Sequence, residues 1–166
     1  LSVLKVKTGQ QRMDSTMVSS NILDMSRLQL LVTALQRIYR ALSESDQQRY
    51  AETFAPYLRG HAGQYVYRIK GKKAVEKQLN KIGKLMQRLL AKLREAYGEE
   101  PAYQVLLRLF KDNFRIEETG VYAKANEELE AGCLQSVDDL EATYRKKGQR
   151  KYKGYGVNLS ETCDPE

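Results

Sequence analysis

Residues 72–97 read KKAVEKQLNKIGKLMQRLLAKLREAY. Apolar residues recur in this stretch at every third or fourth position, which is the spacing of one face of an α-helix. Gly98 suits the end of such a helix, and Pro101 suits the first turn of the next one. The pattern therefore predicts a long amphipathic helix with the inward-facing residues Val75, Leu79, Ile82, Met86, Leu89, Leu93 and Tyr97.

A second stripe, made of cations, runs along the face of this segment that lies away from the leucines. Only Glu76 interrupts the basic run between Arg68 and Arg94. Like charges at this spacing repel one another and weaken a helix, so the run suggests a polyanionic partner whose phosphates release counterions on contact. Such contacts position DNA without reading its sequence, and a solvated helix face is the plainer alternative. The candidate DNA-binding residues of this stripe are Lys73, Lys77, Lys81, Lys84, Arg88 and Lys92.

Helical patterns flank this segment on both sides. An apolar stripe from about residue 21 to Leu42 predicts a helix whose start Ser26 or an upstream serine can cap. Residues 43–46 predict a break and a new cap, followed by a shorter helix to about Arg59. The helix that begins near Pro101 is expected to continue inward through Phe114. Together these segments predict a helical hairpin or a small bundle.

Strand-like patterns occur mainly near the two ends of the sequence. Val3–Lys7 alternates apolar and charged residues, which is the period of a half-buried strand, and Asp14 follows at the end of this segment. Near the other end, Tyr155, Val157 and Leu159 alternate with small polar residues. Residues 65–69 are expected to form a further short extended piece, and residues 138–144 a short helical turn.

The overall charge favours a polyanionic partner. The chain has 166 residues and a net charge of +7, which fits one basic domain that would meet nucleic acid first and an anionic membrane surface second. No apolar run approaches the length of a membrane span. Cys133 and Cys163 fit neither a metal spacing nor a disulfide framework, which is typical of the reducing cytoplasm. His61 lies between glycines and is expected in a loop.

A second basic cluster precedes the final strand. It interleaves cations with Tyr152 between Tyr144 and Tyr155. The cluster either holds a phosphate backbone or acts as a charged lead-in that protects an edge strand. Its candidate DNA-binding residues are Arg145, Lys146, Lys147, Arg150 and Lys151.

Asp14 is the candidate for metal chemistry. A carboxylate at a strand end can bind Mg²⁺, which prefers oxygen ligands, but phosphodiester chemistry with two metals needs further carboxylates. The spacing alone favours a turn or a helix cap at Asp14-Ser15-Thr16.

Two sets of residues, in this order and at this separation, favour the catalytic interpretation. One is Arg12–Thr16 with Ser19–Ile22 and Ser26–Leu28, and the other is Leu134–Lys147 with Lys153–Tyr155 and Glu161–Asp164. They resemble the catalytic domain of bacterial insertion-sequence DDE transposases. The resemblance implies a ribonuclease-H-like core in which Asp14 is the first acid of the catalytic triad and a ligand of Mg²⁺ or Mn²⁺.

The same resemblance implies how the chain is organised. The fold is expected to be mainly α, of the α+β class, with a helical bundle inserted between two short antiparallel core strands that bring Leu4 and Val6 near Val157 and Leu159. The expected divisions are a first core strand over 1–16, the helical insertion over 17–116, an extended basic connector over 117–151 and an incomplete second core strand over 152–166. The family's second Asp and its Glu lie downstream of the segment resembling Glu161–Asp164, so the chain is expected to be a fragment that is inactive and binds no metal by itself.

In the full enzyme of that family, a metal-bound water or a DNA 3′-hydroxyl attacks a phosphodiester at the transposon end. The expected partner is double-stranded transposon DNA at the bacterial nucleoid, in the cytoplasm and without a membrane. An exposed first strand also favours pairing with another copy, as a homo-oligomer. The alternatives are a non-enzymatic basic helical nucleic-acid-binding module and a helical interaction domain that is basic for solubility.

Overall fold

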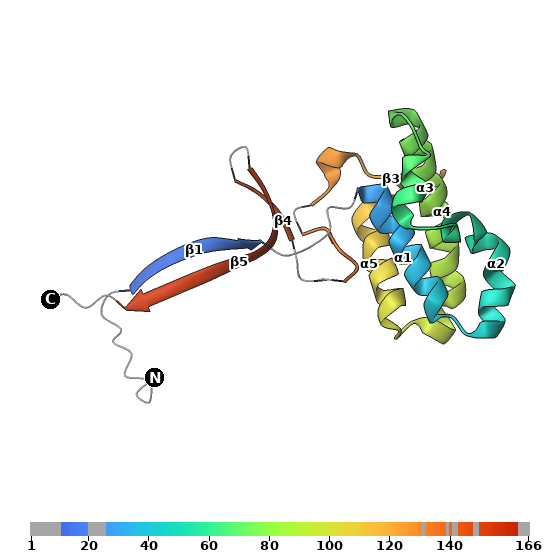
Figure 1. The fold of residues 1–166 in the computed structure, drawn as a ribbon, viewed down its shortest axis with the longest axis horizontal. Coiled ribbons are helices and arrows are strands. Elements are labelled where there is room, and N and C mark those ends of the chain that lie inside the picture. The colour runs from blue at the N-terminus through green and yellow to red at the C-terminus, as the bar shows by residue number, and fades with distance from the viewer. Residues whose placement is uncertain are drawn as a thin grey trace.

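The computed structural model describes residues 11–19, 26–130, 132–138, 140, 143–147 and 150–162, and it describes side chains within 26–130, 132–138 and 140. This part of the chain is mainly helical, with antiparallel strands, as the sequence predicts (Figure 1). The helices are α1 (Arg27–Ala41), α2 (Glu44–Leu58), α3 (Ala62–Tyr67), α4 (Lys72–Tyr97), α5 (Pro101–Asn113) and the short 3₁₀ helix η2 (Asn126–Glu128). The strands are β1 (Gln11–Ser19), β2 (Phe114–Glu117), β3 (Gly120–Ala123), β4 (Thr143–Lys147) and β5 (Arg150–Thr162).

The helix boundaries follow from the capping residues. The Ser26 hydroxyl accepts a hydrogen bond from the Gln29 amide at 3.2 Å and starts α1. The Ser43 hydroxyl accepts from the Asp46 amide at 3.3 Å, so α2 begins at Glu44, close to the predicted start. Pro101 occupies the first turn of α5. These caps and the bounds of α4 are confirmed.

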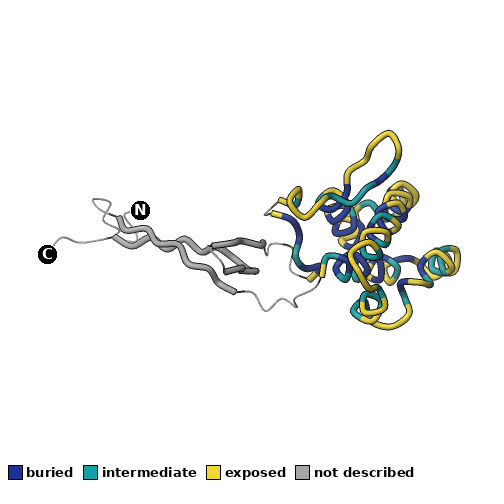
Figure 2. The backbone as a smooth tube through the Cα atoms, turned by 90° about the horizontal axis from the view of Figure 1, so that it is seen from above, coloured by how far each residue is buried: buried dark blue, intermediate teal, exposed yellow. Residues whose placement is uncertain are grey.

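The core lies between α1, α4 and α5, with Phe54 and Tyr57 added from α2. Figure 2 shows how buried and exposed positions alternate along the helical part of the backbone. Apolar stripes of these helices face one another because their burial removes apolar surface from water. On α4 the predicted stripe is buried except near the helix ends, where Val75 and Tyr97 are half-buried. The fully buried residues include Leu31, Leu35, Ile38, Ile82, Met86, Leu106 and Leu109.

The prediction that α5 continues through Phe114 is wrong. The helix ends at Asn113, whose buried side-chain amide donates to the Leu109 carbonyl at 2.9 Å. Phe114 turns its ring onto Phe110, with 5.6 Å between ring centroids, and opens a β2–β3 hairpin that packs on α4. Phe114 is buried, as predicted, but its side chain reaches the core from strand β2 rather than from the helix.

Gly83 of α4 makes room for this hairpin. A Cβ atom at Gly83 would lie 2.6 Å from Phe114 Cδ1, which is closer than real Cβ contacts, and 3.0 Å from Val121 Cγ1, which is a tight contact. Both neighbours are themselves buried. The hairpin therefore approaches the α4 backbone only because position 83 has no side chain.

We expect Gly83→Ala to destabilise the chain by about 1–2 kcal/mol. The clash with Phe114 and Val121 outweighs the helix propensity of alanine, which favours the substitution by about 1 kcal/mol. Gly63→Ala in α3 is the control, since a Cβ there would meet only the Gln29 side-chain nitrogen at 3.7 Å. Denaturant unfolding followed by circular dichroism measures both, and a Gly83→Ala variant as stable as wild type would contradict the close packing.

The extended piece predicted at residues 65–69 is also wrong, because α3 covers residues 62–67. The preference of aromatic and β-branched residues for strands depends strongly on the neighbours against which they pack. Here Tyr65 and Val66 pack against the helical core instead, and the Tyr65 hydroxyl donates to Gln78 Oε1 at 3.1 Å. Packing against helices decides the local structure.

A three-stranded antiparallel sheet with strand order β1-β5-β4 extends away from the helices (Figure 1). The first and last described strands, β1 and β5, pair antiparallel, but through Gln11–Ser19, whereas the prediction used residues 3–7. Val157 lies opposite Thr16, and Leu159 lies opposite Asp14. Asp14 therefore lies within β1 rather than at a strand end. Leu4 and Val6, with the rest of the strand predicted at residues 3–7, are outside the described residues.

The segment before β5 differs from the expected extended basic connector. Strand β3, helix η2 and strand β4 all fall within residues 117–151, and strand β2 ends at Glu117. Strand β4 begins at Thr143, where a helical turn was predicted, and β5 already begins at Arg150. The sequence pattern did not predict the β4–β5 hairpin, because cations occupy most of its paired positions and no apolar alternation is visible there.

Candidate nucleic-acid interface

The predicted cationic stripe of α4 lies entirely on the surface. Each of its six side chains is exposed, while Ile82, Met86 and Leu89 on the opposite side are buried. From Lys73 to Lys92 the stripe is about 28 Å long at roughly 1.5 Å per residue, close to the roughly 34 Å of one turn of DNA. This surface, called the α4 basic face below, consists of Lys73, Lys77, Lys81, Lys84, Arg88 and Lys92.

The charge of the α4 basic face is not neutralised by ion pairs within the described side chains. The ion pairs found there join Arg37 to Asp138, and Arg115 to Glu117 and Glu128. The acids of α4 itself are few, namely Glu76 and Glu95. The face therefore offers a nearly continuous positive potential to an approaching anion.

Two hollows follow this face and meet at Lys81. The first runs along the N-terminal half of α4, beside Lys73, Lys77 and Lys84. The second is a groove of about 240 Å³ between α2 and α4, called the α2–α4 groove below. Its lining residues are Tyr50, Thr53, Pro56 and Tyr57 of α2, and Lys81, Leu85, Arg88, Leu89 and Lys92 of α4.

The tyrosine at the bottom of the α2–α4 groove stays neutral. Burial raises the pKa of the Tyr57 hydroxyl to about 12, the neighbouring Tyr65 adds to the rise, and the charge of Arg88 opposes it. The two tyrosine rings lie 5.4 Å apart between centroids. Tyr57 therefore adds no negative charge to the groove at neutral pH.

The second basic cluster is divided between two paired strands. Arg145, Lys146 and Lys147 belong to β4, and Arg150 and Lys151 belong to β5. The register places Lys146 opposite Lys151 and Lys147 opposite Arg150. Like charges directly opposite each other weaken a strand pair. The side chains of these residues and of Asp14 lie outside the described ones. The candidate site is therefore built from the side chains of α4 and its neighbouring helix alone.

Metal-binding groups are not found among the side chains that the structure describes: no three His, Cys, Asp or Glu residues there could hold an ion. Cys133 is buried, and burial raises the pKa of its thiol. His61 is an exposed residue at the start of α3. Cys163 lies outside the described residues. Over the described ranges, no helix is long and apolar enough to cross a membrane.

Sequence reasoning missed the role of Arg27, a half-buried residue at the start of α1. Its guanidinium donates to Asn113 Oδ1 at 2.8 Å, to the Asn113 carbonyl at 2.5 Å and to the Lys124 carbonyl at 2.7 Å. Burial lowers the pKa of this guanidinium. Arg27 thus connects the start of α1 to the end of α5 and to the residue after β3. In the sequence, only its position in the Ser26–Leu28 motif distinguished Arg27 from other arginines.

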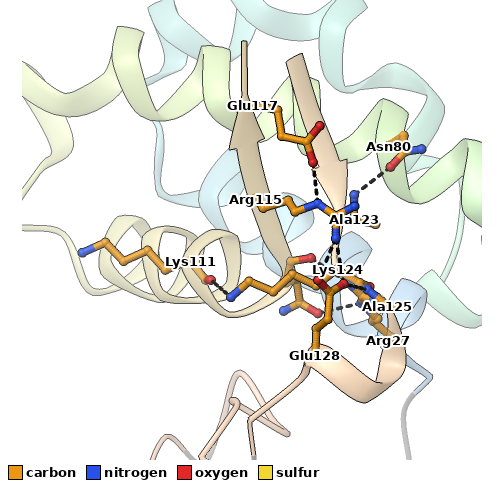
Figure 3. Close-up of polar contacts among 10 residues, drawn as sticks. Arg27, Asn80, Lys111, Arg115, Glu117, Ala123, Lys124, Ala125 and Glu128 are labelled. Carbon is orange, nitrogen blue, oxygen red and sulfur yellow. Dashed lines mark hydrogen bonds and ion pairs between the residues drawn. The ribbon is translucent and has the colours of Figure 1, made fainter. Parts of the chain in front are cut away.

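A second set of polar contacts holds the β2–β3 hairpin (Figure 3). Arg115 pairs with Glu117 at 2.6 Å and with Glu128 at 2.7 Å, and Glu128 also accepts from the Ala125 amide. On the other side, Asn80 Oδ1 accepts from the Ala123 amide at 2.8 Å and fixes the hairpin to α4. These contacts are structural, because they bind the hairpin to the bundle and leave the α4 basic face open.

Part of the motif before β4 also has a packing role. Leu134 and Val137 are buried in the core, and the Leu134 amide donates to Asp112 Oδ2 at 2.9 Å. Arg37 of α1 donates to the Val137 carbonyl and pairs with Asp138 at 3.0 Å. Residues 132–138 therefore lie along α1 and α5 rather than forming a free connector.

Comparison of the chain with protein-family models, curated proteins and solved structures gives no match. Its function is therefore inferred from its residues and their geometry. The α4 basic face and the adjoining α2–α4 groove are the described features best suited to bind another molecule.

Proposed function

We propose that the chain binds double-stranded DNA through the α4 basic face, as the helical insertion of a DDE transposase. The observation that supports this most is the set of six exposed cations along one side of a 26-residue helix. Neighbouring cations destabilise a helix. A polyanion that binds these cations offsets the destabilisation, because its condensed counterions are released into solution. The contacts would fix the position of the duplex, and sequence would be read elsewhere.

The transposase part of the proposal is supported by the strands. A ribonuclease-H-like core begins with two antiparallel strands in the proposed family, and β1 and β5 pair in this way. Asp14 of β1 would then hold a divalent ion, Mg²⁺ or Mn²⁺, which supplies the charge stabilisation for cutting and joining phosphodiesters. The described side chains do not complete such a site.

The test of DNA binding is the affinity of the chain for a blunt duplex as a function of salt. Six phosphate contacts predict a slope of log affinity against log salt of about −5, and a loss of about a thousandfold between about 50 and 200 mM salt. Fluorescence anisotropy with a labelled duplex measures this slope. Absence of binding at the lowest salt would rule out the proposed function.

A basic helical nucleic-acid-binding module without catalysis is the second candidate, because every residue of the α4 basic face belongs to the helical part. It predicts the same duplex binding. The coding sequence downstream of the Glu166 codon separates the two. Codons for a further Asp and a Glu in strand and helix contexts support the transposase, whereas a natural stop codon supports the module.

A further inference from the structure

The α2–α4 groove combines positive charge with an aromatic and apolar wall. Lys81, Arg88 and Lys92 line it from α4, and Tyr50, half-buried, lines it from α2. Leu85, only 6% exposed, contributes apolar surface. No carboxylate is among these described lining residues. The ligand that matches the groove is therefore an anion that also carries a flat apolar group.

The size of the α2–α4 groove limits which anions with a flat apolar group can bind in it. Its volume of about 240 Å³ is close to the roughly 300 Å³ at which pockets for small-molecule ligands begin, and an α-helix of a partner protein, about 10 Å across, is too wide for it. A single nucleotide unit is small enough, and it joins a planar base to a phosphate. Proteins that bind single strands use this combination of stacking and positive charge.

We infer that the α2–α4 groove binds one unpaired nucleotide of a DNA strand that leaves the duplex. The base lies against Tyr50 and Leu85, and its phosphate is neutralised by Arg88 and Lys92. The inference rests on the proposed function, because Lys81, Arg88 and Lys92 belong to both the groove and the α4 basic face. A strand following that face reaches the groove at Lys81.

The experiment compares three labelled DNAs on the whole 166-residue chain: a blunt duplex, the same duplex with a short thymidine tail, and the same duplex with an abasic tail of equal length. The two tails carry the same phosphates and differ only in their bases. A stacked base is worth about 1–3 kcal/mol, so the thymidine tail is expected to bind about tenfold more tightly than the abasic one.

Three variants locate the effect. Thr53 is exposed and lines the groove, so Thr53→Met narrows the groove without adding an aromatic ring or opening a cavity in the core. Tyr50→Ala removes the ring, and Tyr50→Phe keeps it. We expect Thr53→Met and Tyr50→Ala to reduce the preference for thymidine to less than about twofold, while Tyr50→Phe retains it. If Tyr50→Ala unfolds, Thr53→Met decides.

The outcomes separate this inference from the proposed function. Equal binding of the thymidine and abasic tails by the wild-type chain, with the blunt duplex still bound, would overturn the groove assignment alone. A full thymidine preference in Thr53→Met would overturn it as well. Loss of binding to all three DNAs would overturn the proposed function and the groove assignment together.

Discussion

Replacing Lys77, Lys81, Lys84 and Arg88 together with Gln is expected to weaken duplex binding by about three orders of magnitude at about 0.1 M salt. Each lost phosphate contact removes about 0.9 from the slope of log affinity against log salt. The slope should therefore fall from about −5 to about −2. The fold should persist, because all four side chains are exposed and their removal relieves repulsion along α4. Anisotropy titrations at several salt concentrations measure both the affinity and the slope.

A control variant with the same change in net charge isolates the role of the face. Arg40, Arg59, Arg68 and Lys111 are exposed and lie outside α4, so their replacement with Gln should change the slope by less than about 1. An unchanged slope in the α4 variant would place the DNA contact elsewhere. Equal flattening in both variants would mean that net charge, and not the α4 basic face, governs binding.

Arg27→Ala is expected to destabilise the helical part by about 3 kcal/mol. The substitution removes three hydrogen bonds from a charged donor and leaves the carbonyl groups of Asn113 and Lys124 without this partner. Bonds from charged groups contribute about 1.5–3 kcal/mol each, and they do not add fully. The midpoint of thermal unfolding should fall by roughly 10 °C for a unit of this size, which circular dichroism measures.

Arg40→Ala is the matched control, because Arg40 is an exposed arginine in the same helix. Its substitution should change stability by less than about 0.5 kcal/mol. Below the unfolding transition, Arg27→Ala should retain wild-type duplex affinity, since Arg27 is not part of the α4 basic face. A variant of Arg27 as stable as the control would refute the role assigned to its three bonds.

Local patterns were enough to predict the helices. In α4 the hydrophobic stripe and the cationic stripe occupy opposite sides of one continuous helix, so periodicity alone identified both the buried and the exposed residues. The caps at Ser26 and Ser43 were likewise readable because capping depends on a single side chain and its nearest amides.

Long-range packing decided the elements that were missed. Phe114 has the same apolar character in a helix or a strand, and the strand is selected by its packing on Gly83 of α4 and by the pairing of β2 with β3. The register of β1 on β5 was missed for a related reason. A shift by an even number of residues keeps the same side chains on the same face of a strand, so the sequence did not distinguish pairing through residues 3–7 from the observed pairing through Thr16.

The candidate site was predicted only in part. The six cations of α4 were identified from their spacing, but the wall that α2 contributes through Tyr50 and Thr53 was not. Tyr50 and Thr53 belong to the sequence pattern of a different helix, α2, and no local sequence pattern relates them to Arg88 of α4. Their meeting depends on how α2 folds back beside α4, which only the three-dimensional structure supplies.

The Arg27 contacts also affect how the strands find each other. Strands β1 and β5 are far apart in the sequence, and closing so long a loop has an entropic cost that grows with its length. Arg27 places the start of the helical unit beside Lys124, near its end. Once that unit has folded, the chain between Ser19 and Arg150 behaves as a much shorter loop, which lowers the entropic cost of pairing the two strands.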